Sequence, residues 1–278
     1  MIQTSRQHYE GLLADRYSWL YGGFEAKLAE NESFLKRHSI VPALPGARAG
    51  DLGAGPGFQS IALAAAGFAV DAVDRSPTLL RELERHAEAR GIAWAAAGAS
   101  GSANGPGVAP IRTVEADLVE FLAPQNRLSA DSYELLTCMG DTLPHLPSFA
   151  AVEAFFEAAQ QKLKVGGRLI LGFRDLSQTL TGLDRFIPVR SDAERLFTCF
   201  LEPESDEHIV VHDLIYEWGA AEGDWQFQKS CYRKLRIGPA WVTERLLRAG
   251  FRIAHEDMAR GFITLIAERA AKVSYRGG

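Results

Sequence analysis

This sequence contains few cysteines and no long apolar run, and both scarcities exclude whole classes of protein. Its 278 residues include three cysteines, Cys138, Cys199 and Cys231, with no C-x-x-C pair among them. We therefore expect reduced thiols, and neither a disulfide framework nor a cysteine-rich metal module. No run approaches the ~18 apolar residues of a membrane span, and no secretory signal opens the sequence. We expect a cytoplasmic protein with no membrane partner.

Basic residues are also scarce relative to acidic ones. The chain carries 30 Lys and Arg against 35 Asp and Glu, a formal net charge of -5, with no sustained Lys/Arg block. Neutralising phosphates requires clustered basic side chains, so no nucleic-acid partner is expected. With 47% hydrophobic residues, the chain can bury one sizeable α/β core with a small annex.

The most informative segment is A-G-D-L-G-A-G-P-G-F-Q-S, residues 49–60. Gly53, Gly55 and Gly57 can adopt positive φ and leave no Cβ in the way, as a strand-to-helix turn against a ligand requires. The following I-A-L-A-A-A-G-F has helix-forming composition, so the free N–H groups of its first turn would face a ligand in the turn. The alternative is a helix cap with no ligand.

The glycine spacing separates two kinds of nucleotide site. A dinucleotide-binding loop follows G-x-G-x-x-G, whereas this loop reads G-x-G-x-G with Phe58 in the sixth position, which disfavours a nicotinamide cofactor. D-L-G-A-G-P-G closely resembles the first motif of the class I S-adenosylmethionine-dependent methyltransferases. The resemblance covers residues 47–175 and 239–269, and it implies S-adenosyl-L-methionine as the cofactor. It also implies that the loop backs the methionine and ribose portions of this cofactor, through Asp51, Gly53, Ala54, Gly55 and Gly57.

A carboxylate follows the glycine loop at the distance that a Rossmann-like fold requires. Asp74 ends the apparent strand F-A-V-D-A-V-D, about twenty positions after the loop, where such folds present an acid to ribose hydroxyls. Arg75 comes next and belongs to the same candidate site. Asp74 could instead cap a helix, but Ser76 suits that role better because Pro77 stands at the first helical position.

A further acid, Asp117, lies in V-E-A-D-L after the apparent strand I-R-T-V. By itself, an Asp after a strand indicates only a turn or a cap. The family resemblance implies that Asp117 accepts from the adenine amino group and that the backbone N–H of Leu118 faces a ring nitrogen.

Residues 131–148, D-S-Y-E-L-L-T-C-M-G-D-T-L-P-H-L-P-S, predict an apolar strand with Met139, Gly140 and Asp141 at its carboxyl end. The loop is similar in style to that of the glycine N-methyltransferase-like branch of the family, which often has Asn in place of Asp141. This implies that the three residues border the methionine end of the cofactor. Asp141 would add a negative charge near the sulfonium, favouring a cationic or amine acceptor or holding the cofactor's amino group. His145 is a candidate general base, or it orients the loop by hydrogen bonding.

Three more residues are candidate contacts for the acceptor or the cofactor. Arg174 follows the strand R-L-I-L-G-F and is suited to bind an acceptor carboxylate in a fork, with a surface ion pair as the alternative. Tyr17, Trp19 and Tyr21 lie in an aromatic segment like those that fold over the cofactor in the glycine N-methyltransferase-like enzymes. Desolvated aromatic faces stabilise a cation by roughly 1 kcal/mol or more. We assign Tyr17 to the cofactor site, Tyr21 to the catalytic site with His145 and Arg174, and packing against the sheet to Trp19.

The order of elements predicts an α/β fold, with a Rossmann-like, doubly wound, seven-stranded sheet, an antiparallel last strand and a β-rich insertion. Residues 1–46 form a helical and aromatic cap, and residues 47–175 and 238–278 form the methyltransferase core. Residues 176–237 form the insertion. Because it leaves the carboxyl end of a core strand, we expect it to be a wall of the active site or a dimer interface.

The sequence therefore predicts an S-adenosylmethionine-dependent methyltransferase with a small-molecule acceptor, with a homodimer as one option for its assembly. No metal is expected, because His208 and His212 have no identifiable third ligand. A non-catalytic S-adenosylmethionine-binding module is the alternative, and an NAD(P)-dependent oxidoreductase is a less favoured one. The motifs leave open whether N, O, C or S receives the methyl group.

Overall fold

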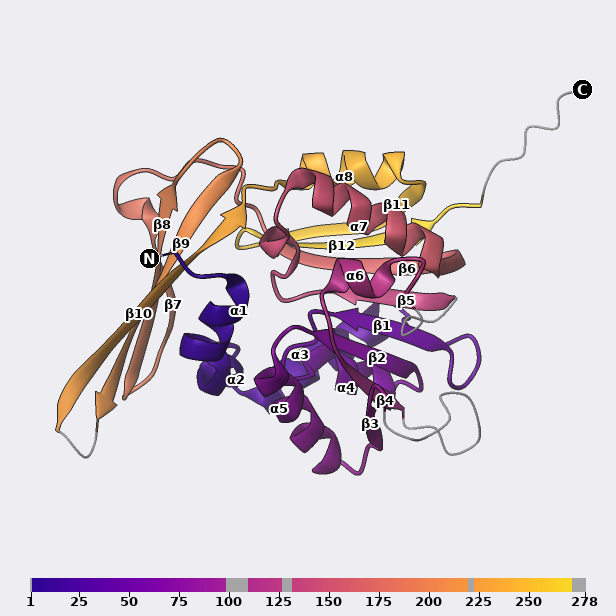
Figure 1. Cartoon of the computed structure of the whole chain (residues 1–278), viewed down its shortest axis with the longest axis horizontal. Coiled ribbons are helices and arrows are strands. Elements are labelled where there is room, and N and C mark those ends of the chain that lie inside the picture. Colours follow the sequence, from indigo (N-terminus) through magenta and orange to yellow (C-terminus); the bar gives the residue numbers. More distant parts are fainter. Residues whose placement is uncertain (1, 99–109, 127–131, 220–222, 272–278) are drawn as a thin grey trace, which may run out of the picture.

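The computed structural model describes residues 2–98, 110–126, 132–219 and 223–271 (Figure 1). It contains an α/β core, a separate four-stranded sheet and an N-terminal segment between them. The helices of the core are α3 (Phe24–Arg37), α4 (Phe58–Ala65), α5 (Pro77–Glu88), α6 (Leu118–Leu122), η3 (Leu143–His145), α7 (Phe149–Lys162) and α8 (Pro239–Arg248). Its strands are β1 (Arg48–Leu52), β2 (Ala69–Asp74), β3 (Trp94–Ala96), β4 (Ile111–Glu115), β5 (Tyr133–Cys138), β6 (Leu163–Arg174), β11 (Phe251–Ala259) and β12 (Phe262–Arg269).

The core sheet has the strand order β11-β12-β6-β5-β1-β2-β4-β3. Strand β12 is antiparallel to both of its neighbours, β6 and β11, whereas the pairs from β6 to β3 are all parallel. The predicted Rossmann-like sheet with an antiparallel last strand is confirmed. The sheet has eight strands where the sequence predicts seven, because three residues, Trp94–Ala96, add β3 to its edge. A strand so short has no periodicity to detect.

Local sequence signals explain where the long helices begin. Ser76 caps α5, since its Oγ accepts a hydrogen bond from the Leu79 backbone N–H at 3.3 Å, and Pro77 occupies the first helical position. Ser148 caps α7 in the same way, accepting from the Ala151 N–H at 3.1 Å. The predicted cap at Ser76 is confirmed.

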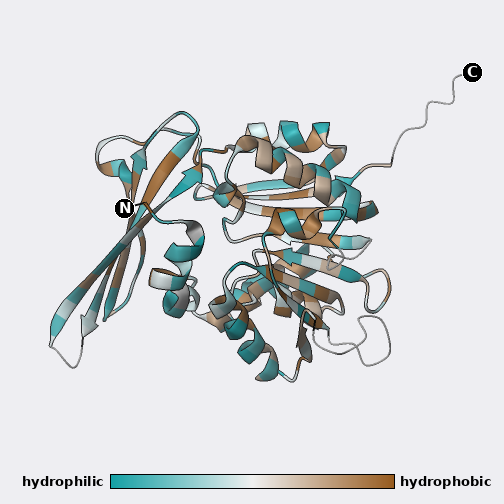
Figure 2. Ribbon diagram, in the orientation of Figure 1, coloured by the Kyte–Doolittle hydropathy of each residue, from teal (hydrophilic) through white to brown (hydrophobic). Residues whose placement is uncertain are grey.

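Two apolar clusters fill the two sides of the core sheet. On one side, α3, α4 and α5 supply residues such as Leu28, Ile61 and Leu83. On the other, α6, α7 and α8 supply Phe121, Phe156 and Leu246 among others. The core strands are mostly hydrophobic in Figure 2, while α5 is largely hydrophilic, as expected for a helix with one face in solvent. The sheet is therefore covered on both faces, as parallel sheets require.

The insertion forms an antiparallel sheet of its own, with the strand order β10-β9-β8-β7. After η4 (Gly182–Arg185), its strands are β7 (Phe186–Ser191), β8 (Arg195–Pro203), β9 (His208–Gly219) and β10 (Asp224–Leu235). The expected hairpin is present, with Trp218 paired to Trp225, although residues 220–222 of its turn lie outside the described residues. One face is buried; the other exposes Phe186, Leu196, Tyr216, Trp218, Trp225 and Phe227.

The N-terminal segment lies against the buried face of the insertion sheet. It contains α1 (Ser5–His8), η1 (Tyr9–Leu13), η2 (Ala14–Arg16) and α2 (Tyr17–Leu20). The buried His8 Nε2 lies 2.9 Å from Asp213 Oδ2, and Trp19 Nε1 donates to Asp192 Oδ2 at 2.6 Å. Trp19 therefore packs against the insertion sheet and not against the core sheet.

Burial predicts that two phenylalanine side chains, one in α7 and one in β7, contribute very differently to the free energy of unfolding. Phe156→Ala removes a fully buried ring and should lower the free energy of unfolding by about 3–5 kcal/mol. Phe186→Ala, at a ring 48% exposed on the insertion sheet, is the matched control and should cost less than about 1 kcal/mol. Urea unfolding followed by circular dichroism measures both, and equal losses would contradict the assignment of the core.

Candidate active site

A cleft lies at the carboxyl ends of β1, β2 and β4, the edge at which open α/β sheets bind ligands. It encloses about 740 Å³ of space, part of which is open to solvent. Of the residues predicted from the sequence, the cleft brings together Tyr17, Gly53, Gly55, Asp74, Arg75, Asp117, Leu118 and His145. Its other walls are Arg6, Tyr9, Val73, Ser76, Leu79, Ala116, Thr142 and Leu146.

The glycine loop between β1 and α4 leaves no room for side chains at two positions. Gly53 has φ +84°, and a Cβ on it would lie 2.5 Å from Thr142 Oγ1. Gly57 has φ +96°, and its Cβ would lie 2.5 Å from Leu83 Cγ. Ala54, between them in the loop, is buried. The loop backbone is therefore packed closely against the turn after β5 on one side and against α5 on the other. Between these two contacts, the N–H of Gly55 faces Asp74.

Asp74 stands at the end of β2 with both carboxylate oxygens engaged by the backbone. Oδ2 accepts from the Gly55 N–H and Oδ1 from the Ser76 N–H, each at 2.8 Å. Burial is the largest cause of its raised pKa, and these backbone hydrogen bonds act in the opposite direction. A carboxylate offers about four acceptor sites, so these backbone hydrogen bonds do not use its full capacity. Asp74 can thus support the loop and still accept from hydroxyls in the cleft.

Asp117 combines a capping role with a place in the cleft wall. Its Oδ1 accepts from the backbone N–H groups of Val119 and Glu120, so it is the N-cap of α6. Its Oδ2 lies 3.6 Å from Arg75 Nη1, whose side chain is largely exposed. Leu118, the first residue of α6, also lines the cleft. The two interpretations of Asp117 left open by the sequence, a cap and a binding residue, are compatible in this geometry.

Asp51 lies beneath the glycine loop, where it is 1% exposed and contributes nothing to the cleft lining. Its carboxylate accepts hydrogen bonds from Ser60 Oγ at 2.6 Å and from Thr137 Oγ1 at 2.8 Å. Burial raises the pKa of Asp51 to about 6, despite these two hydrogen bonds. The structure thus makes Asp51 a support that joins β1, α4 and β5.

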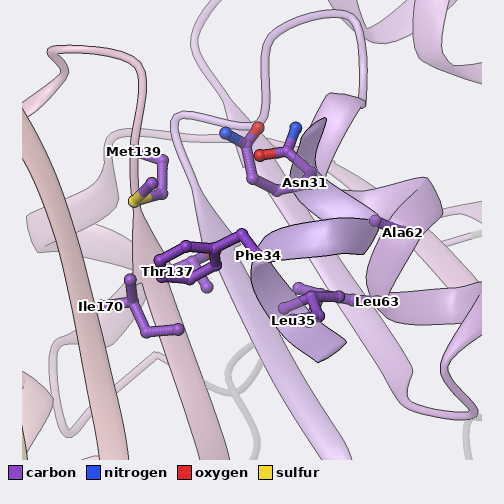
Figure 3. Close-up of a pocket in the computed structure, with 9 residues that line it drawn as sticks. Asn31, Phe34, Leu35, Ala62, Leu63, Thr137, Met139 and Ile170 are labelled. Atoms are coloured by element: carbon purple, nitrogen blue, oxygen red, sulfur yellow. The ribbon is translucent and has the colours of Figure 1, made fainter. Parts of the chain in front are cut away.

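The Met139 side chain extends away from the cleft into a second, smaller pocket. Figure 3 shows this pocket between α3, α4 and the core sheet, with Met139, Phe34 and Ile170 among its walls. A Cβ on Gly172 would lie 2.9 Å from Met139 Sδ. The backbone of Met139 remains part of the turn after β5, since its carbonyl accepts from Thr142 Oγ1 at 2.8 Å. The contribution of Met139 to the cleft edge is therefore made by its backbone.

Asp141, in the same turn, is paired with basic groups on two elements. Its Oδ1 accepts from the Arg174 backbone N–H at 2.8 Å, and its Oδ2 accepts from Lys234 Nζ of the insertion sheet. The Arg174 guanidinium Nε lies 4.0 Å from Oδ2. The negative charge of Asp141 is therefore compensated by two basic residues, and its role toward a ligand stays a prediction.

His145 lines the cleft and makes a hydrogen bond with a residue of the N-terminal segment. Its Nε2 lies 3.0 Å from Tyr9 Oη, and its ring stacks on that of Tyr232 at 5.3 Å. Nδ1 is buried with no hydrogen-bond partner among the described residues. Burial, aided by the charge of Lys234, lowers the pKa of His145 well below the usual value for histidine. The imidazole is therefore neutral near pH 7 and has one ring nitrogen available.

The tyrosines and Arg174 lie at the border between the cleft and the turn after β5. Tyr17 packs against Tyr21, with ring centroids 5.2 Å apart, and a Cβ on Gly55 would lie 3.5 Å from the Tyr17 ring. The Tyr21 hydroxyl donates to the Gly140 carbonyl at 3.4 Å. Tyr21 is not among the residues that line the cleft. The Arg174 side chain is 50% exposed beside Asp141, so it combines an ion pair with access to solvent.

Sequence reasoning missed Tyr9, Tyr232 and Lys234. Tyr9 stands in the aromatic N-terminal segment, but its hydrogen bond to His145 spans 136 residues and leaves no local signal. Tyr232 and Lys234 alternate along β10, so both face the core from one side of that strand. A lysine at an inward position of a strand is unusual, and that is the one signal that marks it.

No group of three or more His, Cys, Asp or Glu side chains is arranged to hold a metal ion within the described ranges. In the same part of the chain, no helix has the length and apolar character needed to cross a bilayer.

Comparison with known proteins identifies the fold. No protein-family model and no curated protein matches the sequence. Many solved structures match this one, and three methyltransferases are among them. CcbJ from Streptomyces caelestis is 17% identical with a TM-score of 0.65, over 87% of this chain and 89% of its own. CalS10, an amino pentose methyltransferase from Micromonospora echinaspora with bound S-adenosylmethionine, is 17% identical with a TM-score of 0.61, over 89% of this chain and 92% of its own. The sugar N-methyltransferase KedS8 from a Streptoalloteichus species is 14% identical with a TM-score of 0.59, over 98% of this chain and 94% of its own. The chain has the Rossmann-like fold of these methyltransferases.

The raised pKa of Asp51 predicts a pH-dependent effect of one substitution. Between its unfolded pKa of about 4 and its folded pKa of about 6, the native state binds more protons than the unfolded state, so ionisation of Asp51 lowers stability as pH rises. Asp51→Asn removes this titration. The free energy of unfolding of this variant, relative to that of the wild type, should therefore increase by about 1–3 kcal/mol from pH 4.5 to 7.5. Urea unfolding at both pH values measures it, and a difference independent of pH would contradict the assignment.

Proposed function

We propose that this protein is an S-adenosylmethionine-dependent methyltransferase that acts on a small molecule. The observation that carries the proposal is the joining of the glycine loop to Asp74, through the Gly55 N–H, in a cleft at the carboxyl ends of the core strands. The shared fold of CcbJ, CalS10 and KedS8, all methyltransferases, supports it.

The residues of the cleft fit the chemistry of this cofactor. The loop exposes backbone at Gly53 and Gly55, where a Cβ would obstruct close approach, and Asp74 has lone pairs for a ribose diol. Asp117 Oδ2 is placed to accept from an exocyclic amine, and Leu79, Leu118 and Leu146 give apolar surface for a purine ring. We infer that the adenosine part binds here, and that Gly140 and the Met139 backbone border the methionine end.

The bound cofactor would supply an electrophilic methyl group, and the protein's contribution is alignment and exclusion of water. Tyr9 and Tyr17 cover the cleft from the N-terminal segment, so access depends on that segment. His145, neutral and with Nδ1 unpaired among the described residues, is the residue suited to take a proton from the acceptor. Its hydrogen bond to Tyr9 fixes the orientation of the ring.

The acceptor, in our proposal, is a small polar molecule that enters near Tyr21, His145 and Arg174. The half-exposed Arg174 offers a cation for an acidic group. KedS8 acts on a sugar and CalS10 on an amino pentose, which makes amino sugars the first acceptors to test. The likeness of the turn to the glycine N-methyltransferase-like branch remains a prediction about loop style, and the cytoplasmic location and a homodimer remain predictions from the sequence.

Ligand binding tests the cofactor site directly. We expect S-adenosylhomocysteine to bind the purified protein, and NAD(H) and NADP(H) not to bind. Asp74→Ala should weaken S-adenosylhomocysteine binding by roughly 10- to 100-fold, because charged hydrogen bonds to the ligand are lost. Asp184→Ala, at an exposed aspartate of η4, is the matched control and should leave affinity unchanged. Isothermal titration calorimetry measures the affinities; binding of NAD(P)H in place of S-adenosylhomocysteine would overturn the proposal.

Turnover distinguishes an enzyme from a binding module. The protein should transfer label from methyl-labelled S-adenosylmethionine to a member of a metabolite pool enriched in amino sugars, detected by mass spectrometry. If the cofactor binds but no pool yields a methylated product, the catalytic part of the proposal is wrong.

The lowered pKa of His145 predicts where activity is lost in acid. Because protonation of the buried ring is unfavourable, the titration of His145 should not change kcat/KM near neutral pH. Instead, kcat/KM should fall only below about pH 6.5, the ordinary value for histidine. His145→Gln should lower kcat by roughly 100-fold or more, whereas His212→Gln, at a histidine paired with Glu202 on the insertion, should not. A histidine-dependent loss centred at or above pH 6.5 would contradict the assignment.

A further inference from the structure

Lys234 and Asp141 form a buried ion pair that joins the insertion sheet to the core. Lys234 Nζ donates to Asp141 Oδ2, and the two residues are 7% and 6% exposed. Such a pair is not a source of stability by itself, but removal of one partner leaves an uncompensated charge in the interior. The chain thus brings a cation across 93 residues to a carboxylate beside the candidate active site.

The backbone at Asp141 is in an unusual conformation. Its φ is +69°, a left-handed value that only a few per cent of non-glycine residues adopt. Three contacts hold it there: its N–H donates to the Gly172 carbonyl at 3.0 Å, its Oδ1 accepts from the Arg174 N–H, and its Oδ2 accepts from Lys234. The next residue, Thr142, lines the cleft and touches the glycine loop. The ion pair therefore helps to fix the turn that borders the cleft.

Lys234 also acts on the electrostatics of the cleft. Its Nζ lies 5.6 Å from the centroid of the Tyr232 ring, and that ring stacks on His145. Burial is the largest cause of the lowered pKa of His145 and of the raised pKa of Tyr9 and Tyr21; the charge of Lys234 adds to the first shift and the charge of Asp141 to the other two. Residues beside the cleft therefore experience both charges of the ion pair, that of Lys234 at His145 and that of Asp141 at Tyr9.

We propose that Lys234 is a positioning residue for methyl transfer. Its ion pair with Asp141 fixes the turn after β5 and cancels the negative charge that this turn would otherwise present at the methionine end of the cleft. This inference rests on the proposed function, because it concerns the charge that a cationic cofactor meets. A cleft without this compensation would hold the positively charged substrate more tightly than the neutral product, and so would favour the ground state of the reaction.

The test is a cycle of four proteins: the wild type, Asp141→Asn, Lys234→Met and the double variant. The ligands are S-adenosylhomocysteine, whose sulfur is neutral, and sinefungin, which carries an ammonium group in place of the methyl sulfonium. Calorimetry at pH 7 gives the ratio of the two dissociation constants for each protein. Because it compares two ligands on one protein, a loss of affinity caused only by loosened structure lowers both affinities and leaves the ratio unchanged.

We expect the two single variants to shift this ratio in opposite directions. Lys234→Met leaves the carboxylate unpaired and should favour sinefungin by roughly fivefold or more, whereas Asp141→Asn leaves the ammonium unpaired and should favour S-adenosylhomocysteine. The double variant should return to the wild-type ratio within about twofold, since asparagine tolerates the left-handed backbone. A ratio that is the same in all four proteins, or shifts of equal sign, would overturn the inference.

Stability of the ligand-free proteins gives an independent readout. Lys234→Met should lower the melting temperature by roughly 8 °C or more, and the double variant should recover at least half of that loss. If Lys234→Met does not fold, Asp141→Asn and the double variant still decide the sign of the ratio. If the wild type binds neither ligand, the proposed function fails, while the melting temperatures still test the ion pair. A double variant no more stable than Lys234→Met would overturn the pairing.

Discussion

The fit of the glycine loop between Thr142 and Leu83 is the constraint on which the rest of the site depends. Any side chain at Gly53 or Gly57 would overlap these residues, so the loop backbone is located relative to β5 and to α5 at once. With the loop in place, the Gly55 N–H reaches Asp74 at the end of β2. Asp51, beneath the loop, joins β1 to α4 through Ser60 and to β5 through Thr137. Three neighbouring strand ends are thus held in one arrangement by contacts at a single turn.

The remaining walls of the cleft come from parts of the chain outside the central fold. The N-terminal segment contributes Tyr9 and Tyr17, and the insertion sheet holds that segment through His8 and Trp19. The insertion also reaches the core directly, because Lys234 pairs with Asp141 and Tyr232 stacks on His145. The Rossmann-like core forms the floor of the cleft, and the N-terminal segment and the insertion sheet add the residues that cover it and set the charge beside it.

Residues whose role is local could be predicted from the sequence. The glycine loop, Asp74 and the Ser76 cap each lie within a few residues of the feature that identifies them, and the order of strands and helices indicated the sheet topology. The compensation of the Asp141 charge by Lys234 could not be predicted in this way. Lys234 is on an inserted strand, and the register of that strand depends on tertiary packing. The burial of Asp51 could not be predicted for a related reason: a carboxylate before a glycine loop has the same sequence signature whether it faces a ligand or two buried hydroxyls.

The contact between His8 and β10 has a consequence for the order in which the protein is made. The hydrogen-bond partner of His8 on this strand, Ser230, follows it by 222 residues. At a synthesis rate of roughly 5–20 residues per second, the N-terminal segment leaves the ribosome at least ten seconds before its partner exists. Tyr9 and the other aromatic residues of this segment therefore spend that interval without their final packing. The cleft is completed only after β10 has been synthesised, so a nascent chain with a folded glycine loop would still lack the cover of the candidate site.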